Sequence, residues 1–411
     1  MIDTTLATSS IGLDATVAST NLPSGASLPA PSSTLPRSTV LPRLEMVGAT
    51  PRLVVQGKPR YEHMRPLGQG GLGEVIGARD NDIDRDVAVK RLRPDVSSPA
   101  TVARFVEEVR TIGRLEHPNI VPIHDVGVDE RGEYYFVMKY VAGETLEAVI
   151  DKLAAGDVDY HARYGFERRV QIFMALLEAV AFAHSKGIVH RDIKPANVMV
   201  GAYGEVVLMD WGIAKRLRDD GDAKAAALGP AHASASGKRG PLFATVAGEI
   251  IGTPAYMSPE QARGEAIDER SDLYSLAMLM HELLCLRHPF ADRTTLAEML
   301  HGVKNEVVPI TGLVPSAHQP PTPMDLSWFV RKGLAKDAAS RYQSATEMIG
   351  ALTRRAEGDI AVNCHITFMR RVTVLGTRFV DRHPFAATGL LAAFVVASIA
   401  GVVETILRLA A

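Results

Sequence analysis

A change of pattern near residue 146 constrains the fold of this chain more than any other feature. Between Tyr61 and that point, short strand-like runs such as DVAVKRL and EYYFVMKYV alternate with turns and flank one helix candidate, TVARFVEEVRTIGRL. Beyond it the sequence is mainly helical in pattern, as in RRVQIFMALLEAVAFAHSKG. A strand-rich part followed by a larger helix-rich part predicts an α+β fold with two lobes of unlike class.

The remaining segments are arranged around this two-lobed unit, which we expect to span residues 58–355, with the lobes meeting at 141–142. Residues 1–57 are rich in Ser, Thr, Pro and Ala and contain no aromatic residue, so we predict a disordered tail. A basic segment (356–384), an apolar stretch (385–403) and a short tail (404–411) follow. The low-complexity stretch Asp219 to Gly240 predicts a surface insertion.

Charge and cysteine content exclude two broad classes of protein. The chain has 45 basic and 47 acidic residues and a net charge of -2, which argues against a general nucleic-acid binder. Its two cysteines, Cys285 and Cys364, lie far apart and form no CxxC pattern. No disulfide framework or zinc site is predicted, and a reducing compartment fits best.

A glycine-rich loop opens the strand-rich part. Its glycines at GxGxxG spacing leave room for close backbone approach to a ligand, and their amides can bind phosphate oxygens. The candidate nucleotide-binding residues here are Leu67, Gly68, Gln69, Gly70, Gly71, Leu72, Gly73, Glu74 and Val75. The β-type run that follows favours a strand-loop-strand cover over a dinucleotide-binding turn. From the glycines alone, phosphate binding and a structural hairpin remain equal alternatives.

A lysine and a helical glutamate form the next candidate pair. Lys90 ends the run Val87 to Val89, about seventeen residues after the loop, where a lysine can point toward the phosphates under it. Glu108, in the helix candidate, is the expected ion-pair partner that fixes the ammonium group. Glu107 is the competing choice, and an ordinary solvated strand lysine is the plainer alternative.

The strongest chemical signal is the segment HRDIKPAN, at 190–197, followed by DWG at 210–212. Asp192 suits the base that orients an acceptor hydroxyl, and Lys194 can balance charge on a transferred phosphoryl group. Asn197 and Asp210 supply hard oxygen ligands of the kind that Mg²⁺ prefers. These ordered residue types have little structural reason to occur together, so phosphoryl transfer is the favoured chemistry.

With these motifs the sequence resembles the protein kinase superfamily, and the wording of the motifs is most similar to the bacterial serine/threonine branch. The resemblance runs from about Tyr61 to Leu352 and includes GTPAYMSPE at 252–260 and RYQSA at 341–345. It implies a bilobal kinase fold, ATP and Mg²⁺ as cofactors, and proteins with Ser or Thr as substrates. It also implies that Asp272 anchors the catalytic loop and that Glu260 and Arg341 form a buried pair.

The resemblance extends to the adenine site and to substrate specificity. The residues that it assigns to adenine contacts are Ala88, Met138, Lys139, Tyr140 and Val141. Met138 takes the gatekeeper place, and the three residues after it would offer backbone bonds. Lys194 and Thr253 are the choices found in serine/threonine kinases.

Two departures from the family pattern concern regulation. Trp211 replaces the usual phenylalanine beside Asp210, and the activation segment, from Asp210 to Glu260, is long. Arg191 precedes the catalytic aspartate and is expected to pair with a phosphorylated activation segment. Thr245 is the first autophosphorylation candidate. Ser234 and Ser236 are weaker ones.

The apolar stretch Phe385 to Val403 contains nineteen residues without a charge. At ~1.5 Å per residue it spans ~28 Å, close to a bilayer core, so we predict a single transmembrane helix. A buried or interfacial helix is the alternative. Four arginines precede the stretch and one follows it, which places the catalytic part in the cytoplasm. Small residues recur every fourth position at Gly389, Ala393, Ala397 and Gly401, a row compatible with a homodimer.

Three functional hypotheses follow. The favoured one is an active serine/threonine protein kinase that autophosphorylates and works in bacterial signal transduction. The second is a membrane-tethered pseudokinase scaffold, which the presence of Lys90, Asp192 and Asp210 disfavours. The third, a small-molecule phosphotransferase, is disfavoured by the long activation segment and by SPE at 258–260, which resemble a platform for protein substrates.

Overall fold

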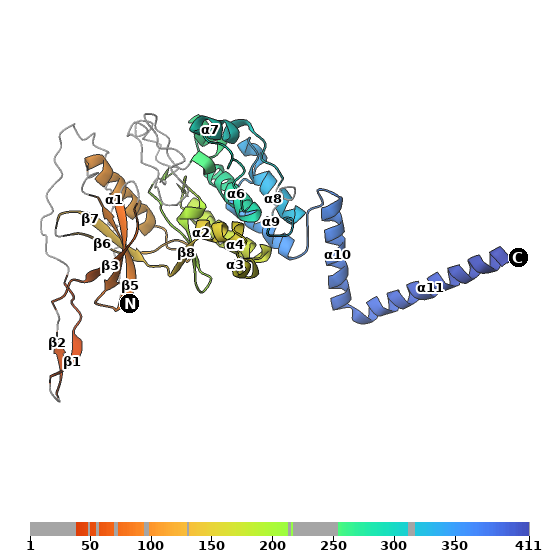
Figure 1. Cartoon of the computed structure of the whole chain (residues 1–411), viewed down its shortest axis with the longest axis horizontal. Helices are drawn as coiled ribbons and strands as arrows, with labels where there is room; N and C mark the ends of the chain where they lie inside the picture. The colour runs from red at the N-terminus through yellow and green to blue at the C-terminus, as the bar shows by residue number, and fades with distance from the viewer. Residues whose placement is uncertain are drawn as a thin grey trace, which may run out of the picture.

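The computed structural model describes residues 38–47, 50–54, 57–69, 73–93, 98–129, 131–212, 215–216, 254–310 and 317–410. It confirms the α+β prediction: a β-sheet lobe with one helix lies beside a larger helical lobe (Figure 1). The predicted insertion at 219–240 and the candidate phosphosites Thr245, Ser234 and Ser236 lie outside the described residues, as does Thr253.

The small lobe is an antiparallel sheet with the strand order β3-β4-β5-β7-β6. Its strands are β3 (Tyr61–Gln69), β4 (Gly73–Asp80), β5 (Arg85–Leu92), β6 (Ile123–Val128) and β7 (Tyr134–Lys139). Side chains alternate between its two faces. Val87 and Val89 of β5 pack with Ala78, Tyr135 and Val137 in a small core on one face. The other face therefore receives the side chains of the alternate residues, among them Lys90.

Helix α1 (Pro99–Gly113) is the predicted helix of the small lobe. It begins at an N-cap, because the hydroxyl of Ser98 accepts a hydrogen bond from the amide of Thr101 and Pro99 occupies the first turn. Its buried residues include the apolar Phe105 and Ile112, at a helical spacing, and one carboxylate, Glu108. A buried acidic residue in an apolar helix face requires a cationic partner.

The large lobe is built around α6 (Glu269–Cys285), which is buried along nearly its whole length. The helices of this lobe are α2 (Leu146–Ala154), α3 (Val158–Arg163), α4 (Phe166–Ser185), α5 (Pro259–Arg263), α6, α7 (Leu296–Asn305), α8 (Met324–Gly333) and α9 (Ala345–Ala356). Three short 3₁₀ turns accompany them at Pro195–Asn197, Pro254–Tyr256 and Ala338–Ser340. One continuous hydrophobic core joins these helices to α1 and the sheet.

Short strands flank the loop from 190 to 197. They are β8 (Gly143–Thr145), β9 (Ile188–Val189), β10 (Val198–Gly201), β11 (Val206–Leu208) and β12 (Lys215–Arg216). The order is β11-β10-β8 in one sheet and β12-β9 in the other. The loop from 190 to 197 therefore lies between two strand pairs that fix both of its ends.

The prediction that residues 1–57 form a disordered tail is wrong for the part of this segment that the structure describes. Strands β1 (Arg43–Val47) and β2 (Thr50–Val54) form an antiparallel hairpin. The segment before it is held to the small lobe, because the amides of Val40 and Leu41 donate to Asp82 Oδ1 at 2.8 and 3.1 Å. This segment is ordered by polar backbone contacts and not by a hydrophobic core. Amino-acid composition does not reveal such contacts. Residues 1–37 lie outside the described chain.

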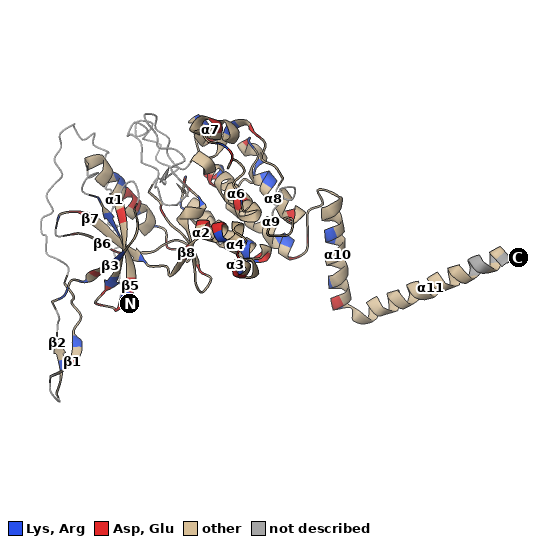
Figure 2. Cartoon of the chain, in the orientation of Figure 1, with Lys and Arg blue, Asp and Glu red and all other residues tan. Residues whose placement is uncertain are grey.

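Two helices follow the large lobe: α10 (His365–Arg382) and α11 (Pro384–Ala410). The chain turns at His383 and Pro384, and α11 leads away from the body of the molecule (Figure 1). Residues Pro384–Val403 have a mean hydropathy of 2.2, none of them is buried, and no charged side chain interrupts them (Figure 2). By length and composition this is a candidate membrane span. The helix continues beyond the predicted end at 403, so 404–410 is not a separate tail.

Candidate active site

Lys90 stands at the centre of a cluster of charged side chains between the lobes. Its ammonium Nζ lies 2.5 Å from Glu108 Oε1 of α1 and 3.5 Å from Asp210 Oδ1 of the large lobe. Glu107 is exposed, so the structure selects Glu108 of the two candidate partners. The cluster links β5, α1 and the segment after β11, three elements that are distant in sequence.

The ionisation of this cluster follows from its burial and its pairing. Burial alone would lower the pKa of Lys90, but the carboxylates of Glu108 and Asp210 more than offset this and raise it. Lys90 is therefore a cation at neutral pH. Burial raises the pKa of Glu108, an effect that the ammonium partly offsets. Burial would also raise the pKa of Asp210, yet Lys90, Lys194 and His190 together lower it. A carboxylate held ionised in this way can bind a cation.

The loop at 190–197 brings three of the predicted site residues together: Asp192 and Lys194, predicted as catalytic, and Asn197, predicted as a metal ligand. Lys194 Nζ donates to Asp192 Oδ2 at 2.8 Å. The amide of Asn197 donates to the backbone oxygen of Asp192 at 2.9 Å and to its Oδ2 at 3.3 Å. These bonds orient the Asp192 carboxylate from two sides, as a base that must align with an acceptor hydroxyl requires.

Asp272 of α6 anchors this loop from beneath, as the resemblance implied. Its carboxylate accepts the backbone amides of His190 and Arg191, each at 2.8 Å, and the Nε2 of His184 lies 2.9 Å from Oδ2. Arg191 has a positive φ of 72°, a conformation that a residue other than glycine adopts only when its surroundings enforce it. The buried carboxylate supplies that enforcement.

The two candidate metal ligands are neighbours because of a hairpin. Strands β10 and β11 pair with Val198 opposite Leu208, and the amide of Met209 donates to the backbone oxygen of Asn197 at 2.9 Å. Asn197 and Asp210 therefore lie at the same end of this hairpin. Among the described residues no group of three His, Cys, Asp or Glu side chains could hold a metal by itself. One amide oxygen and one ionised carboxylate fit Mg²⁺, which commonly takes few protein ligands and completes its shell with phosphate and water.

The glycine loop is described at both ends, whereas Gly70, Gly71 and Leu72 lie outside the described residues. A Cβ at Gly73 would lie 2.3 Å from the backbone oxygen of Arg91, so this glycine is required by the close approach of β4 and β5. A Cβ at Gly68 would meet no atom of the described residues within 4 Å, its chain neighbours aside. The two glycines thus differ: packing between strands explains only Gly73. The Glu74 carboxylate pairs with Arg91, which stabilises the base of the loop.

The sheet places the other expected nucleotide-binding residues on the face that carries Lys90. Val75 is paired with Lys90 across β4 and β5, and Ala88 with Met138 across β5 and β7. Directly opposed residues point to the same face, and residues two apart on a strand also share one. Val75, Ala88, Lys90 and Met138 therefore form one surface of the sheet. Val141, just after β7, is buried.

The remaining residues of the predicted adenine site and loop are partly exposed. The hydroxyl of Tyr140 accepts a hydrogen bond from Arg65 at 2.6 Å, which links the segment after β7 to β3. Lys139 closes β7 opposite Val87. Leu67 and Gln69, near the end of β3, are solvent-exposed.

Trp211, the departure from the family pattern, is fully buried. Its ring centroid lies 4.5 Å from that of His190, whose Nε2 lies 3.1 Å from the backbone oxygen of Met209. Asp210 has a positive φ of 59°, and a Cβ at Gly212 would lie 3.2 Å from Glu108 Oε2. The indole thus packs under the catalytic loop, while the glycine leaves room for the glutamate of α1.

The side chain of Arg191 is half-buried and only partly hydrogen-bonded among the described residues. Burial lowers the pKa of its guanidinium group, with Asp272 partly offsetting this, and its Nε has no hydrogen-bond partner among the described residues. Its backbone oxygen accepts a hydrogen bond from Gln261 at 3.1 Å.

The implied pair of Glu260 and Arg341 is present and buried. Both guanidinium Nη atoms lie 2.8 Å from the two carboxylate oxygens. Burial would raise the pKa of Glu260, but the hydrogen bonds from Arg341 and Ser271 lower it to about 2. The pair ties α5 to the segment before α9.

Sequence reasoning missed the roles of His184 and Gln261. His184 lies six residues before His190 and shares its anchor, Asp272. Gln261 forms the capping box of α5 with Ser258 and also reaches the catalytic loop. The capping pattern SPEQ at 258–261 was the available signal, although it indicates a helix start and not the long-range bond.

Comparison with known proteins agrees with this geometry. The protein kinase domain family matches residues 61–351. The chain is 38% identical over 296 residues to "Probable serine/threonine-protein kinase SCO3848" of Streptomyces coelicolor, covering 70% of this chain and 39% of that protein. It is 34% identical over 305 residues to the serine/threonine-protein kinase PknD of Protochlamydia amoebophila (72% and 30%). It is 36% identical over 304 residues to PknB of Mycobacterium tuberculosis (73% and 43%).

The aligned region spans less than half of the length of these relatives. It nevertheless contains every described residue of the charged cluster and of the catalytic loop, because all of them lie between 61 and 351. The fold, the site and the family match lead to the same conclusion: the chain belongs to the protein kinase family, in the bacterial branch of serine/threonine kinases.

Proposed function

We propose that this chain is an active serine/threonine protein kinase that transfers the γ-phosphoryl group of ATP to hydroxyl groups of proteins. The observation that carries the proposal is the complete charged cluster between the lobes. Lys90 is paired with Glu108 at 2.5 Å and lies near Asp210, and the Asp192 carboxylate is oriented by Lys194 and Asn197. A pseudokinase scaffold would not need all of these groups.

Each side chain has a role that its surroundings support. Lys90, held cationic by two carboxylates, would bind the α- and β-phosphates of ATP. Asn197 and Asp210 would hold Mg²⁺, which when bound neutralises charge on the phosphate oxygens. Asp192 Oδ atoms would orient the acceptor hydroxyl and accept its proton as the new P–O bond forms and the bond to the β-phosphate oxygen breaks. Lys194 would stabilise the charge on the transferred group.

A transfer assay with the purified full chain tests this proposal. Incubation with Mg-ATP and a generic basic protein substrate should give phosphoserine or phosphothreonine, and Asp192→Asn should lower the rate by about 10³-fold. Asp159→Asn, an exposed position on α3, is the matched control and should retain full activity. Absence of transfer by the wild type, with Mg-ATP binding intact, would support the scaffold instead.

We further propose that the chain autophosphorylates in its activation segment and takes part in bacterial signal transduction. Arg191 supports this, because its half-buried guanidinium group, with an Nε that has no partner among the described residues, is suited to pair with a phosphate. Thr245 remains the first candidate acceptor and Thr253 the residue expected to help define serine/threonine specificity. Mass spectrometry after incubation with Mg-ATP should find a phosphate at Thr245 that Asp192→Asn lacks. Full activity with an unmodified Thr245 would contradict this assignment.

We also propose that α11 anchors the protein in the cell membrane by a single pass, with the kinase domain in the cytoplasm. Residues Pro384–Val403 are apolar and unburied, and Arg370, Arg371, Arg378 and Arg382 precede them. Cell fractionation should find the protein in the membrane pellet after a carbonate wash. Release into the soluble fraction would contradict the anchor. The row of small residues on α11 supports a homodimer, which crosslinking in membranes would test.

A further inference from the structure

Helix α10 differs from α9, an amphipathic helix of the large lobe, in the direction of its apolar face. In α9 the apolar residues Ala345, Met348 and Leu352 are spaced i, i+3, i+7 and point into the core, each at most 2% exposed. In α10 the apolar residues other than Val374, which packs near Gly358, are instead exposed. This stripe consists of Phe368, Val372, Leu375 and Phe379, at i, i+4, i+7 and i+11, each between 43% and 52% exposed.

The polar side of α10 is what holds it to the kinase domain. Arg371 pairs with Asp359 at 3.0 Å, Arg370 pairs with Asp325 of α8, and Thr367 is fully buried. These contacts fix the rotation of the helix about its axis. The apolar stripe is therefore turned away from the domain by specific bonds, and is not exposed merely because the helix is detached.

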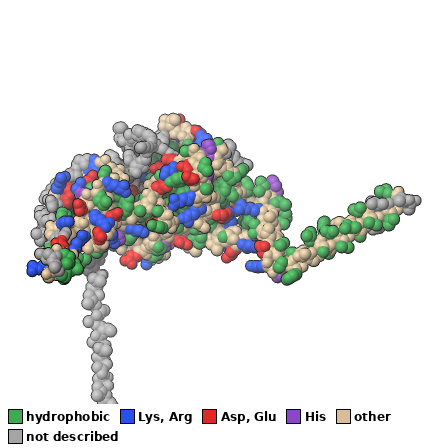
Figure 3. Space-filling view, turned by 60° about the horizontal axis from the view of Figure 1, so that its bottom comes forward, with side chains coloured by type: hydrophobic (Ala, Val, Ile, Leu, Met, Phe, Trp, Pro, Cys, Tyr) green, Lys and Arg blue, Asp and Glu red, His purple; other side chains and the backbone are tan. Residues whose placement is uncertain are grey.

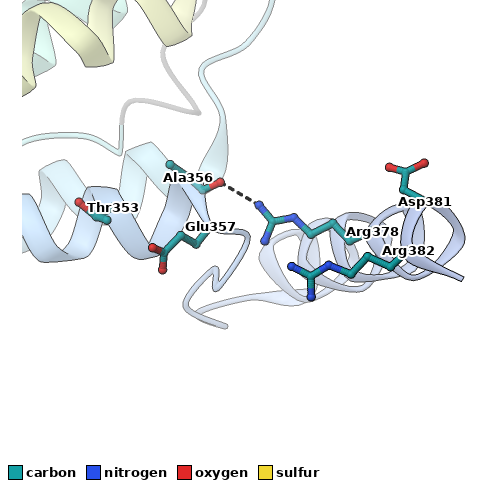
Figure 4. Close-up of a pocket in the computed structure, with 6 residues that line it drawn as sticks. All are labelled: Thr353, Ala356, Glu357, Arg378, Asp381 and Arg382. Carbon is teal, nitrogen blue, oxygen red and sulfur yellow. Dashed lines mark hydrogen bonds between the residues drawn. The ribbon is translucent and has the colours of Figure 1, made fainter.

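The C-terminal half of α10 stands off from the domain. A cleft of about 770 Å³ separates it from the end of α9 (Figure 4). Arg378 and Arg382 both extend into this cleft toward α9, and Arg378 donates to the backbone oxygen of Ala356 at 3.0 Å. That bond satisfies a terminal carbonyl of α9. The arginines of this half thus lie on the domain side as well, which leaves the outer side apolar.

The direction of α11 shows what the stripe faces. Only His383 separates the two helices, and the chain turns sharply there, because Pro384 cannot continue the hydrogen-bond pattern of α10. The kinase domain lies on one side of α10, and α11 departs on the other (Figure 1). That other side is the one turned away from the arginines that bind the domain. Figure 3 shows hydrophobic side chains along the exposed surface of α11 as well. A bilayer spanned by α11 would therefore meet α10 on its apolar face.

We propose that α10 is an interfacial helix whose apolar stripe enters the boundary of the bilayer that α11 spans. The inference rests on the membrane anchor proposed above. A helix of this kind buries its apolar face about 5–10 Å into the region between headgroups and acyl chains. Because α10 is fixed to α8 and to the segment after α9, its insertion sets the orientation of the whole kinase domain relative to the membrane. The catalytic cluster would thus have a fixed orientation relative to the membrane surface, which a flexible linker would not provide.

Spin labels on the full chain test the depth of α10 directly. The labels are attached to Leu375→Cys and Phe379→Cys in the stripe, in a background with Cys285→Ala and Cys364→Ser, after reconstitution into phosphatidylcholine and phosphatidylglycerol vesicles. The matched control is Thr377→Cys, exposed on the same turn but outside the stripe. We expect both stripe labels to show a several-fold lower collision rate with a water-soluble nickel chelate than the control, and a higher rate with oxygen.

A fourth label, Val395→Cys in α11, separates this inference from the anchor itself. If Val395→Cys is protected from the chelate while the stripe labels behave like Thr377→Cys, the interfacial helix is refuted and the anchor stands. If Val395→Cys is also accessible to the chelate, both proposals fail. If the stripe labels are shielded from chelate and oxygen alike, protein covers the stripe and the bilayer assignment is wrong. Circular dichroism of each variant confirms that the fold is retained.

Discussion

Two buried ion pairs in this protein differ in how completely their polar atoms are hydrogen-bonded. Lys90 with Glu108 lies between the lobes at 2.5 Å, and Arg341 with Glu260 lies in the large lobe at 2.8 Å. Arg341 is saturated: besides Glu260 it donates to the backbone oxygens of Ala335, Arg270 and Lys336. Glu108 Oε2, in contrast, has no hydrogen-bond partner among the described residues.

The two ion pairs differ in whether hydrogen-bonding positions remain free to bind a third group. In the large lobe every hydrogen-bonding position of Arg341 is used, so the pair can only hold the fold together. Between the lobes a second carboxylate, Asp210, lies 3.5 Å from Lys90 and is about one third exposed. Unused polar atoms cost stability, and a protein keeps them where a ligand will satisfy them. Saturation therefore separates a structural pair from one that is prepared for binding.

Removal of Arg341 should give the largest effect and should act on stability. Arg341→Met leaves the Glu260 carboxylate buried without its main partner, which we expect to lower the free energy of unfolding by about 3–5 kcal/mol. Urea unfolding followed by far-UV circular dichroism measures it. The turnover of the fraction that remains folded should be close to that of the wild type. A much smaller loss of stability would show that the pair is not structural.

Acid should weaken the same pair in a defined range. The pKa of Glu260 is about 2 in the fold against an ordinary value of 4.5, so its contribution is present above pH 4.5 and is lost as the pH falls toward 2. Over this range the stability gap between the wild type and Glu260→Gln should shrink by about 3 kcal/mol. Urea titrations at neutral and at acid pH test this. If the stability difference between the wild type and Glu260→Gln does not change with pH, the pairing with Arg341 does not keep Glu260 ionised.

Removal of Lys90 should act mainly on catalysis. Lys90→Met is expected to lower kcat/KM for ATP by about 10²-fold, because the phosphates lose their cation. Stability should fall less than in Arg341→Met, since the raised pKa of Glu108 allows that carboxyl to take up a proton. Steady-state kinetics and urea unfolding of the same preparations provide both values. Lys186→Met, exposed on the large lobe, is the control. Equal losses of stability in Lys90→Met and Arg341→Met would contradict the distinction between a binding pair and a structural pair.

The surface pair of Lys332 and Glu347 should contribute least to stability among the ion pairs compared. The two side chains lie 2.7 Å apart, with 45% and 38% exposed. Lys332→Met should therefore change the free energy of unfolding by less than about 1 kcal/mol and leave turnover unaffected. The same urea and kinetic measurements apply. A loss as large as that of Arg341→Met would mean that burial is not what separates these pairs.

The sequence predicted local chemistry well. Asp192, Lys194 and Asn197 lie within six residues, so the chain itself brings them together once a short loop forms. The two-lobe order and helix α1 also follow from local patterns, because alternation and helical periodicity are properties of consecutive residues. The boundary of the tail was less predictable: the segment before the hairpin of β1 and β2 is held by the amides of Val40 and Leu41, which donate to the side chain of Asp82, more than forty positions away.

By itself the sequence determined the family, the catalytic loop and an apolar segment long enough to cross a membrane, since each depends on the types and spacing of neighbouring residues. Only the tertiary structure decided that Lys90 pairs with Glu108 and not Glu107, and that Asp210 joins them from 120 positions further along the chain. It also decided which way α10 faces, because its bonds to Asp325 and Asp359 set the rotation of the helix. Such choices depend on packing between distant elements, which no local pattern encodes.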